Sequence, residues 1–319
     1  MIKTKRGSLS HIVISTILGH GGFGMFPYFF FPTFWYFLFT IWRNNISIFA
    51  KSATRHRHCG NFIWWNPWTW RFVHVIKNKE SLLNAYGLTN PGVVICAIMI
   101  RIACMLGFKV IPSYFIDFSR GYITGLREAE QAICIYKKIL GKYFWAIELN
   151  PSCPNHKEPI LTNQGNILAA LRALKQKFPW LHFIIKGSIV YPGEFYSQAE
   201  QAGADTTHVI NTISFDVAVG MGISPYEKSP LGEKTKGGFS GKIITDAACK
   251  YSTGTVIPAT TGSLIFGGGI SEWRDTLPYQ QKLRSRGDRR NFSFSICTAA
   301  KFNFIEAARF AKNFHPIEY

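Results

Sequence analysis

Short apolar runs alternate along the chain with segments whose apolar residues recur at helical spacing. Three of the helical segments, residues 124–140, 166–178 and 193–202, have one apolar and one polar face. The apolar runs have the length of buried strands. There are eight of them, at residues 12–18, 46–51, 109–116, 145–150, 182–187, 207–211, 263–267 and 291–297. Eight strands, most of them separated by helical stretches, predict a parallel β/α fold.

Polar and glycine residues fall at or just past the carboxyl ends of these runs. They are Lys51, Asn150, Lys186, Asn211, the glycines at 267–269, and Thr298. The pattern alone allows an open doubly wound sheet or a closed barrel. A barrel brings every carboxyl end to one face, where active sites of that fold lie. We therefore expect a (β/α)8 TIM barrel as a single domain over residues 1–319, with residues 1–10 as a basic N-terminal tail.

Basic residues outnumber acidic ones. The chain has 36 Lys and Arg against 18 Asp and Glu, a formal charge of +18, and its first 79 residues hold ten Lys or Arg and no carboxylate. Such a surface favours anionic partners, whether phosphate groups, nucleic acid or acidic lipid, but compositional drift gives the same excess. Charge therefore narrows the class of partner only weakly.

The cysteines indicate whether the protein works in a reducing or an oxidising compartment. There are seven, at Cys59, Cys96, Cys104, Cys134, Cys153, Cys249 and Cys297. This odd and scattered set contains no C-x-x-C pair, which favours a reducing compartment over a disulfide framework. The basic opening MIKTKRGSLS is not followed by a small-residue cleavage site. We therefore expect a cytoplasmic protein.

Residues 26–42, FPYFFFPTFWYFLFTIW, are extremely apolar. They reach only the lower limit of the roughly 17–25 residues that cross a bilayer. Pro27 and Pro32 interrupt their first part. A buried strand, a glycine turn and a first core helix would give the same pattern. A core segment is the favoured interpretation, and peripheral contact with a membrane fits better than a span.

A second basic cluster, TRHRHC at residues 54–59, could offer metal ligands through His56, His58 and Cys59. Metal sites need three or four convergent ligands, and the sequence suggests no fourth. We expect no metal, and interpret the cluster as a mobile lid that attracts an anionic substrate.

The stretch best suited to catalysis or ligand binding is AIELNPSCPN, residues 146–155. Two prolines stiffen the exit from the strand. Asn150 and Asn155 then flank Cys153, and carboxamides recognise planar amides and imides because they carry both donor and acceptor groups. A thiol, with an ordinary pKa of about 8.5, can serve as a general acid or base. The stretch predicts a binding and proton-transfer site; a turn with a structural cysteine is the alternative.

ELNPSCPN resembles the E-L-N-x-S-C-P-N signature of the soluble, cysteine-using dihydroorotate dehydrogenases. Further segments resemble the same family in the same order. They are AKSATRHRHCGN at 50–61, NAYGLTNPG at 84–92, IIKGS with Lys186, VINTIS at 209–214, GGFSG at 237–241, IFGGGI at 265–270 and SICTAA at 295–300. The likeness spans roughly residues 12 to 312. Its strength lies in the ordered set rather than in any one segment.

The resemblance implies an FMN-binding barrel that oxidises dihydroorotate to orotate in de novo pyrimidine biosynthesis. Cys153 would remove a proton from C5 of the substrate while a hydride leaves C6 for the flavin. The implied substrate-binding residues are Lys51, Asn84, Asn150, Asn155, Asn211 and Thr212. The implied cofactor-binding residues are Gly19, Lys51, Asn150, Lys186, Gly241, Gly268, Gly269 and Thr298.

The resemblance also implies partners. Beside dihydroorotate it implies a homodimer and, in the class that reduces NAD, a separate electron-transfer flavoprotein subunit. No nucleic acid is expected. Fumarate, NAD and membrane quinone all stay open as electron acceptors.

Other functions remain possible on the sequence. The tRNA dihydrouridine synthases use a cysteine in a Gly-Cys-Pro context, and dihydropyrimidine dehydrogenase-like reductases typically carry histidine where Asn155 stands. A binding relative that kept the barrel and lost turnover is the non-enzymatic alternative. Cys297, which stands where the family usually places glycine near the phosphate, is compatible with such a relative.

Overall fold

The computed structural model describes residues 80–85, 92–151, 163–233, 236–298, 309–310 and 313–314, and the backbone of residues 2–3, 8–9, 12–15, 47–52 and 73–76. Eight parallel strands close into a barrel, in which their order is their order along the chain. They are β3 (Ile12–Ser15), β4 (Ser47–Ser52), β7 (Lys109–Tyr114), β8 (Ala146–Leu149), β9 (His182–Lys186), β10 (Thr206–His208), β13 (Ser263–Phe266) and β14 (Phe292–Ile296). Each overlaps one predicted run. The closed barrel is therefore confirmed over the open sheet.

The barrel strands whose side chains the structure describes are largely buried on both faces. Ile147, Leu149 and Ile185 belong to the large core that the strands share with the surrounding helices. Ile184 and Ile265 belong to a separate small cluster with Ile111 and Ala146. Strands covered on both faces read as continuous apolar runs, which is why the sequence reveals them.

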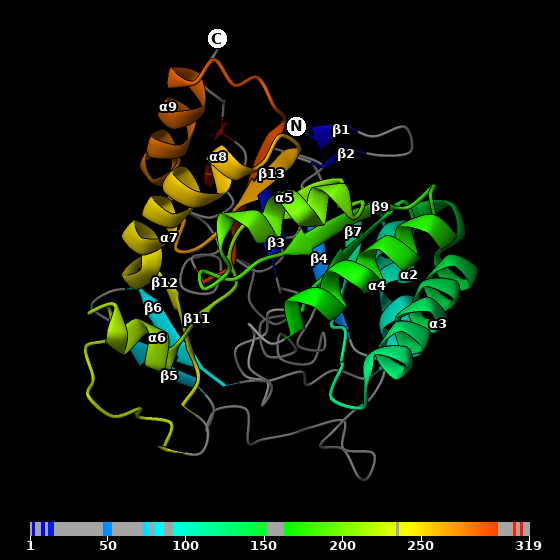
Figure 1. Cartoon of the computed structure of the whole chain (residues 1–319), viewed down its shortest axis with the longest axis horizontal. Coiled ribbons are helices and arrows are strands. Elements are labelled where there is room, and N and C mark those ends of the chain that lie inside the picture. Colours follow the sequence, from blue (N-terminus) through cyan, green and yellow to red (C-terminus); the bar gives the residue numbers. More distant parts are fainter. Residues whose placement is uncertain are drawn as a thin grey trace.

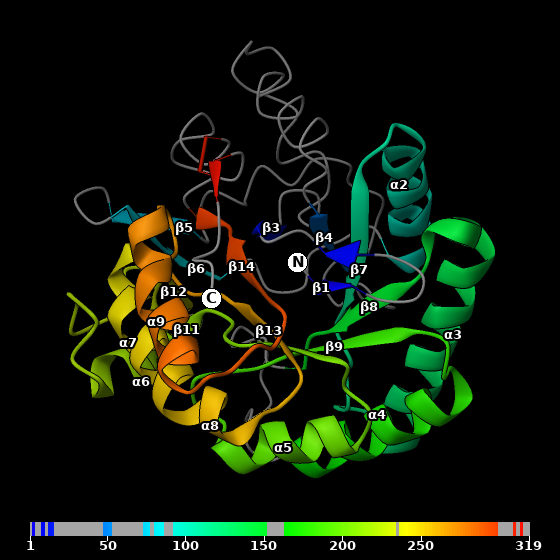
Figure 2. The ribbon, with the colours of Figure 1, turned by 90° about the horizontal axis from the view of Figure 1, so that it is seen from above.

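Helices surround the barrel. They are α2 (Val93–Met105), α3 (Tyr122–Leu140), α4 (Gln164–Lys177), α5 (Gly193–Gln201), α6 (Phe215–Gly220), α7 (Thr245–Tyr251), α8 (Ile257–Ala259) and α9 (Leu277–Ser285). Short 3-10 turns lie at η4 (Gly141–Tyr143), η7 (Lys242–Ile244) and η9 (Trp273–Thr276), and the π-helical turn η8 (Ser252–Val256) joins α7 to α8. In Figure 2, α2, α3, α4, α5 and α8 follow one another around the outside. The three predicted helices are α3, α4 and α5.

Helix α2 is not among the predicted helices, and its sequence VVICAIMIRIACM explains why. Its inner face buries Val93, Ala97 and Ile100, as an amphipathic helix would. Its outer face, however, is apolar as well and exposes Ile98 and Ile102. A helix that is apolar on both faces has no amphipathic period for sequence analysis to detect.

A second, antiparallel sheet of four strands in the order β11-β12-β6-β5 was not predicted either. Strands β5 (Val73–Ile76) and β6 (Ser81–Asn84) come after β4, and β11 (Ile213–Ser214) and β12 (Gly238–Gly241) come after β10. The sheet is therefore built from segments that leave the carboxyl ends of two barrel strands. Figure 1 shows this sheet near α6 and α7, with β12 between β11 and β6. A separate antiparallel pair joins β1 (Ile2–Lys3) to β2 (Ser8–Leu9).

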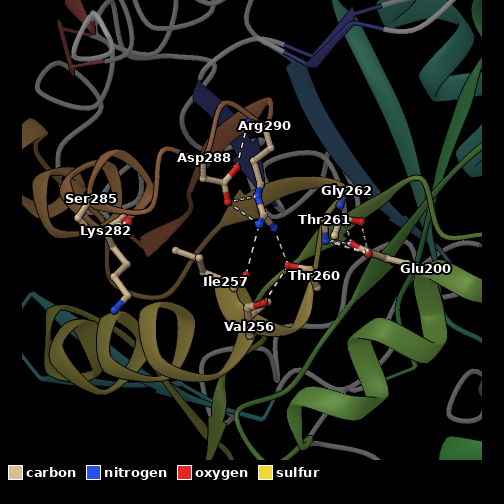
Figure 3. A network of polar contacts seen from close by, with 10 residues as sticks. All are labelled: Glu200, Val256, Ile257, Thr260, Thr261, Gly262, Lys282, Ser285, Asp288 and Arg290. Carbon is tan, nitrogen blue, oxygen red and sulfur yellow. Dashed lines mark hydrogen bonds and ion pairs between the residues drawn. The ribbon is translucent and has the colours of Figure 1, made fainter.

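Polar contacts hold the loops at the amino ends of the strands, as Figure 3 shows. Arg290, just before β14, binds the Asp288 carboxylate at 2.7 Å and donates to Thr260 Oγ1 at 2.8 Å and to the Ile257 carbonyl at 3.3 Å. Glu200, at the end of α5, accepts the backbone N–H groups of the loop before β13, at 3.0 Å from Thr261 and 2.9 Å from Gly262. This end of the barrel is thus closed by stabilising contacts, and the opposite end carries the site.

None of the helices within the described residues is long and apolar enough to span a bilayer. The aromatic segment 26–42, for which a membrane contact was considered, lies outside the described residues.

Candidate active site

The predicted site residues divide into those the structure describes and those it does not. Gly19, Cys153 and Asn155 lie outside the described residues. Lys51 lies on β4, where its backbone pairs with Ser113 of β7. Among the others, whose side chains the structure describes, Asn150 and Asn211 form a carboxamide pair, and Gly241, Gly268, Gly269 and Thr298 form a glycine-rich corner. Asn84 and Lys186 lie outside both groups.

The carboxamide pair joins the segments that follow β8 and β10, the two strands on either side of β9. Asn150 follows β8 directly, and Asn211 lies three residues past the end of β10. The Asn211 side chain donates from Nδ2 to Oδ1 of Asn150 at 2.9 Å, and both residues are buried. The backbone N–H of Thr212 donates to Oδ1 of Asn211 at 3.0 Å. These bonds fix the orientation of both amides, as a preorganised binding group requires.

The exit of β9 runs between these two asparagines. The Asn211 backbone N–H donates to the Gly187 carbonyl at 3.0 Å, and the Gly187 N–H donates to the His208 carbonyl at 2.8 Å. A Cβ at Gly187 would collide with the Tyr196 hydroxyl and come within 2.6 Å of the Val209 carbonyl. Glycine is therefore required here for β9 to leave the barrel beside Asn211.

The glycine-rich corner brings together segments from three parts of the chain. Gly241 ends β12, Gly269 follows β13, and Thr298 follows β14. A Cβ on Gly269 would lie 2.6 Å from the Gly241 carbonyl, and a Cβ on Gly241 would lie 2.9 Å from Thr298 Cγ2. Gly241 and Gly269 have positive φ, 94° and 86° respectively, which L side chains rarely adopt. The predicted grouping of these three residues is thus present in the structure.

Two hydroxyl contacts and a third glycine complete this corner. Thr298 Oγ1 donates to Ser240 Oγ at 3.0 Å, and Thr245 Oγ1 donates to the Gly269 carbonyl at 3.2 Å. Gly268, with φ 100°, packs so closely that a Cβ would lie 2.6 Å from Ala248 Cβ and from Ile210 Cδ1. Glycine loops at this place allow the backbone to approach an oxyanion closely.

Asn84 lies on the antiparallel sheet. It ends β6, pairs in register with Gly238 of β12, and donates from Nδ2 to the Gly238 carbonyl at 3.3 Å. On the same two strands Gly241 pairs with Ser81. Asn84 is therefore placed by the sheet that also carries Gly241, whereas Asn150 and Asn211 are placed by barrel strands.

Lys186 ends β9 and is buried, with 4% of its surface exposed. Its Nζ lies 3.8 Å from Oε1 of Glu148 on β8. Ser113 Oγ on β7 donates to the same Oε1 at 2.5 Å, and Nδ1 of His208 on β10 binds Oε2. Four consecutive strands therefore contribute to one buried polar cluster directly below the carboxamide pair. We call Ser113, Glu148, Lys186 and His208 the lysine cluster.

The cluster keeps Glu148 ionised. Complete burial opposes the charge of this carboxyl, but nearby Lys186 and His208, and the hydrogen bonds from His208 and Ser113, outweigh it and lower its pKa to about 2. The barrel interior thus holds a fixed negative charge beside a buried lysine.

Sequence analysis identified Lys186 but missed Ser113, Glu148 and His208. A period-two signal was available for Glu148: it stands two residues before Asn150, so both side chains lie on the same face of β8. Ser113 and His208 stand in strands without any comparable motif, and only the registers Ser113↔Glu148 and Lys186↔His208 bring them there.

Within the described residues, no group of three or more His, Cys, Asp or Glu side chains is placed to hold a metal ion. His56, His58 and Cys59, considered above as ligands, lie outside these residues.

Comparison with known proteins agrees with this geometry. The family model described as dihydroorotate dehydrogenase matches residues 46–281. The catalytic subunit of dihydroorotate dehydrogenase B (NAD(+)) from Bacteroides thetaiotaomicron is 27% identical over 241 residues, 73% of this chain and 71% of that protein. The proteins of the same name from Bacteroides fragilis and Thermoplasma acidophilum are both 28% identical, over 242 residues (73% of this chain, 71% of theirs) and 210 residues (64% of each) respectively. The chain therefore belongs to the dihydroorotate dehydrogenase family, whose members are FMN-dependent oxidoreductases.

Proposed function

We propose that this protein oxidises dihydroorotate to orotate with FMN as the immediate electron acceptor, a step of de novo pyrimidine biosynthesis. One observation carries the proposal. The buried pair Asn150–Asn211, the lysine cluster and the glycine-rich corner lie at or near the carboxyl ends of the strands of one barrel. A flavin needs an anion site for its phosphate and polar groups for its ring, and this end of the barrel offers both.

The glycine-rich corner fits the phosphate of FMN. Gly268 and Gly269 follow β13, the seventh barrel strand, and Thr298 follows β14, the eighth. Barrels of this type frequently bind phosphate with the loops after strands seven and eight. The polar groups there are backbone N–H groups of residues with positive φ and the hydrogen-bonded hydroxyls of Thr298 and Ser240, a set suited to phosphate oxygens.

The carboxamide pair fits dihydroorotate, a cyclic imide that carries a carboxylate. Oδ1 of Asn150 accepts the Asn211 hydrogen bond, which orients the amide, and Nδ2 of Asn150 is the donor that this amide can offer to a ligand. Donors suit the carbonyl and carboxylate oxygens of this substrate. We assign Asn84, Asn155 and Thr212 to the same substrate site, and Lys51 to the boundary between substrate and flavin.

The proposed reaction divides its work between cofactor and protein. Bound FMN supplies the hydride acceptor. Cys153 removes the proton from C5 of the substrate as general base, and the asparagines hold the ring so that C5 faces the thiolate. Lys186 provides positive charge beside the flavin, where reduction adds electron density. Gly19 and Asn150 complete the proposed flavin contacts.

The names of the relatives support a partner subunit. They are catalytic subunits of a B-type, NAD(+)-dependent enzyme. We infer that this chain forms a homodimer and passes electrons to NAD through an electron-transfer flavoprotein subunit. We also infer a cytoplasmic location, in keeping with the free thiols of Cys96, Cys104, Cys134, Cys249 and Cys297.

The proposal is tested with the purified protein. We expect a yellow preparation whose flavin absorbance bleaches on anaerobic addition of dihydroorotate, with one orotate formed per flavin reduced. Adding NAD, fumarate and a soluble quinone in turn then identifies the acceptor; NAD should reoxidise the flavin only when the partner subunit is present. A colourless preparation, or bound flavin that dihydroorotate does not bleach, contradicts the proposal. Copurifying RNA would favour a tRNA-modifying relative instead.

A further inference from the structure

The lysine cluster contains an ion pair whose negative member has no part in the proposed reaction. Glu148 and Lys186 are almost completely buried, with 0% and 5% of their side chains exposed. Removing a carboxylate and an ammonium from water costs several kcal/mol for each ion. A charged pair placed inside a barrel, where apolar residues would pack well, therefore calls for a reason beyond stability.

The two carboxylate oxygens of Glu148 have different partners. Oε2 binds Nδ1 of His208, which anchors the carboxylate to β10. Oε1 accepts the Ser113 hydroxyl at 2.5 Å and faces Nζ of Lys186 at 3.8 Å. His208 and Ser113 thus hold the carboxylate on either side, and its Oε1 lies beside the lysine ammonium.

Besides binding Glu148, the imidazole of His208 lies close to Gly267. Its Nε2 lies 3.3 Å from the position that a Cβ on Gly267 would occupy, at the exit of β13. His208 also stands directly opposite Lys186 in the β9–β10 register. The strand registers therefore place Glu148, Lys186 and His208 on three adjacent strands, with the carboxylate 3.8 Å from the ammonium.

We propose that Glu148 is a positioning residue for Lys186: it holds the lysine ammonium at the flavin edge and partly offsets the positive charge that the flavin senses. This inference rests on the proposed function, because it takes Lys186 to lie beside the flavin. Its physical consequence concerns the reduction potential of bound FMN. A positive charge favours the electron-rich reduced flavin, and a negative charge behind it weakens that preference.

The test measures the midpoint potential of bound FMN in Glu148→Gln, which keeps the shape and removes the charge. We expect the potential to rise, with the affinity for reduced relative to oxidised FMN increasing about tenfold, equivalent to about 30 mV for a two-electron couple. Glu148→Asp keeps the charge, and its potential should return toward that of the unchanged protein. The matched control is Glu130→Gln, which removes the same charge from a surface pair with Lys177 and should leave the potential unchanged.

A double-mutant cycle shows whether the effect passes through the lysine. In Lys186→Met, the change Glu148→Gln should shift the potential by less than a third of its effect in the presence of the lysine. An unchanged or lowered potential in Glu148→Gln, or an equal shift with and without Lys186, overturns the inference. If Glu148→Gln fails to fold, the potential of Glu148→Asp decides: a shift as large as that of Lys186→Met contradicts the proposed role.

The unchanged protein separates this inference from the proposed function. If it binds no FMN, or binds FMN that dihydroorotate does not reduce, both ideas fail. If its flavin is reduced normally and only the Glu148 variants behave otherwise than expected, the positioning role alone is wrong.

Discussion

Asn150 and Asn211, which are 61 residues apart in the chain, share a buried side-chain hydrogen bond of 2.9 Å. The bond spans the exit of β9, whose last residue is Lys186. Neither asparagine is a catalytic group by itself, but together they place two amides at fixed positions at one rim. The proposed substrate site should therefore be sensitive to a change of either residue.

Replacing Asn211 with alanine should damage substrate binding more than cofactor binding. The change removes one amide and leaves Oδ1 of Asn150 without its buried donor, which costs about 1–3 kcal/mol. We expect kcat/KM for dihydroorotate to fall by about 10–100-fold while the FMN content stays normal. Steady-state kinetics and flavin-to-protein ratios measure both.

The control for this variant is Asn291→Ala, at an exposed asparagine next to the amino end of β14. It should leave kinetics and flavin content as they are. An Asn211→Ala protein with unchanged kcat/KM would remove the carboxamide pair from the substrate site.

Gly269→Ala should weaken FMN binding. Alanine at φ 86° is strained, and its Cβ would lie 2.6 Å from the Gly241 carbonyl and collide with Thr245 Oγ1. The neighbouring loops would have to separate, and this would move apart the N–H groups that we propose to bind the phosphate. We expect the FMN dissociation constant of the apoprotein to rise by at least about tenfold, equivalent to about 1.4 kcal/mol, as measured by fluorescence titration.

Gly232→Ala is the matched control, because Gly232 has φ 92° but no atom within 4 Å of the place that a Cβ would take. It carries the same backbone strain, roughly 1–3 kcal/mol, without the collision. Equal losses of FMN affinity in both variants would show that Gly269 matters for stability only.

The protein should lose stability in acid through Glu148. Its pKa in the folded state is about 2, below its ordinary value of 4.5, because Lys186, His208 and Ser113 outweigh the effect of burial. A depressed folded pKa stabilises the protein above the unfolded pKa, and this contribution disappears as the pH falls from about 4.5 to about 2. The full contribution is of the order of 3 kcal/mol.

Urea unfolding at pH 6 and pH 3 measures this dependence. In Glu148→Gln, the difference in unfolding free energy between the two pH values should be smaller, because the titrating group is absent. An identical difference in both proteins would show that Glu148 is not the group that links stability to acid.

Arg290→Ala should affect stability without affecting the site. Arg290 joins Asp288, Thr260 and the Ile257 carbonyl at the amino ends of the barrel strands, as drawn in Figure 3. Losing these bonds should cost about 1–3 kcal/mol of unfolding free energy. Arg289→Ala, at an exposed neighbour, should cost little. A loss of FMN in Arg290→Ala at temperatures well below unfolding would contradict this separation of the two barrel ends.

The sequence predicted the barrel well because strands such as β8 and β9 are buried on both faces and are followed by or end in polar residues. Asn150, Lys186 and Asn211 could be found since each stands at the end of an apolar run. The antiparallel sheet was missed because strands such as Ser81–Asn84 and Gly238–Gly241 are short, and the second contains two glycines. Ser113 and His208 were missed because only the strand register brings them beside Glu148 and Lys186, and no local sequence pattern reveals register.

The most direct test of the central proposal is single-turnover flavin reduction in Cys153→Ala, measured by rapid anaerobic mixing with dihydroorotate. We predict that this variant retains FMN but that its flavin is reduced about 10²–10⁴-fold more slowly, because the general base is absent. Cys153→Ser should recover part of the rate at high pH. Flavin reduction at the unchanged rate in Cys153→Ala would contradict the account.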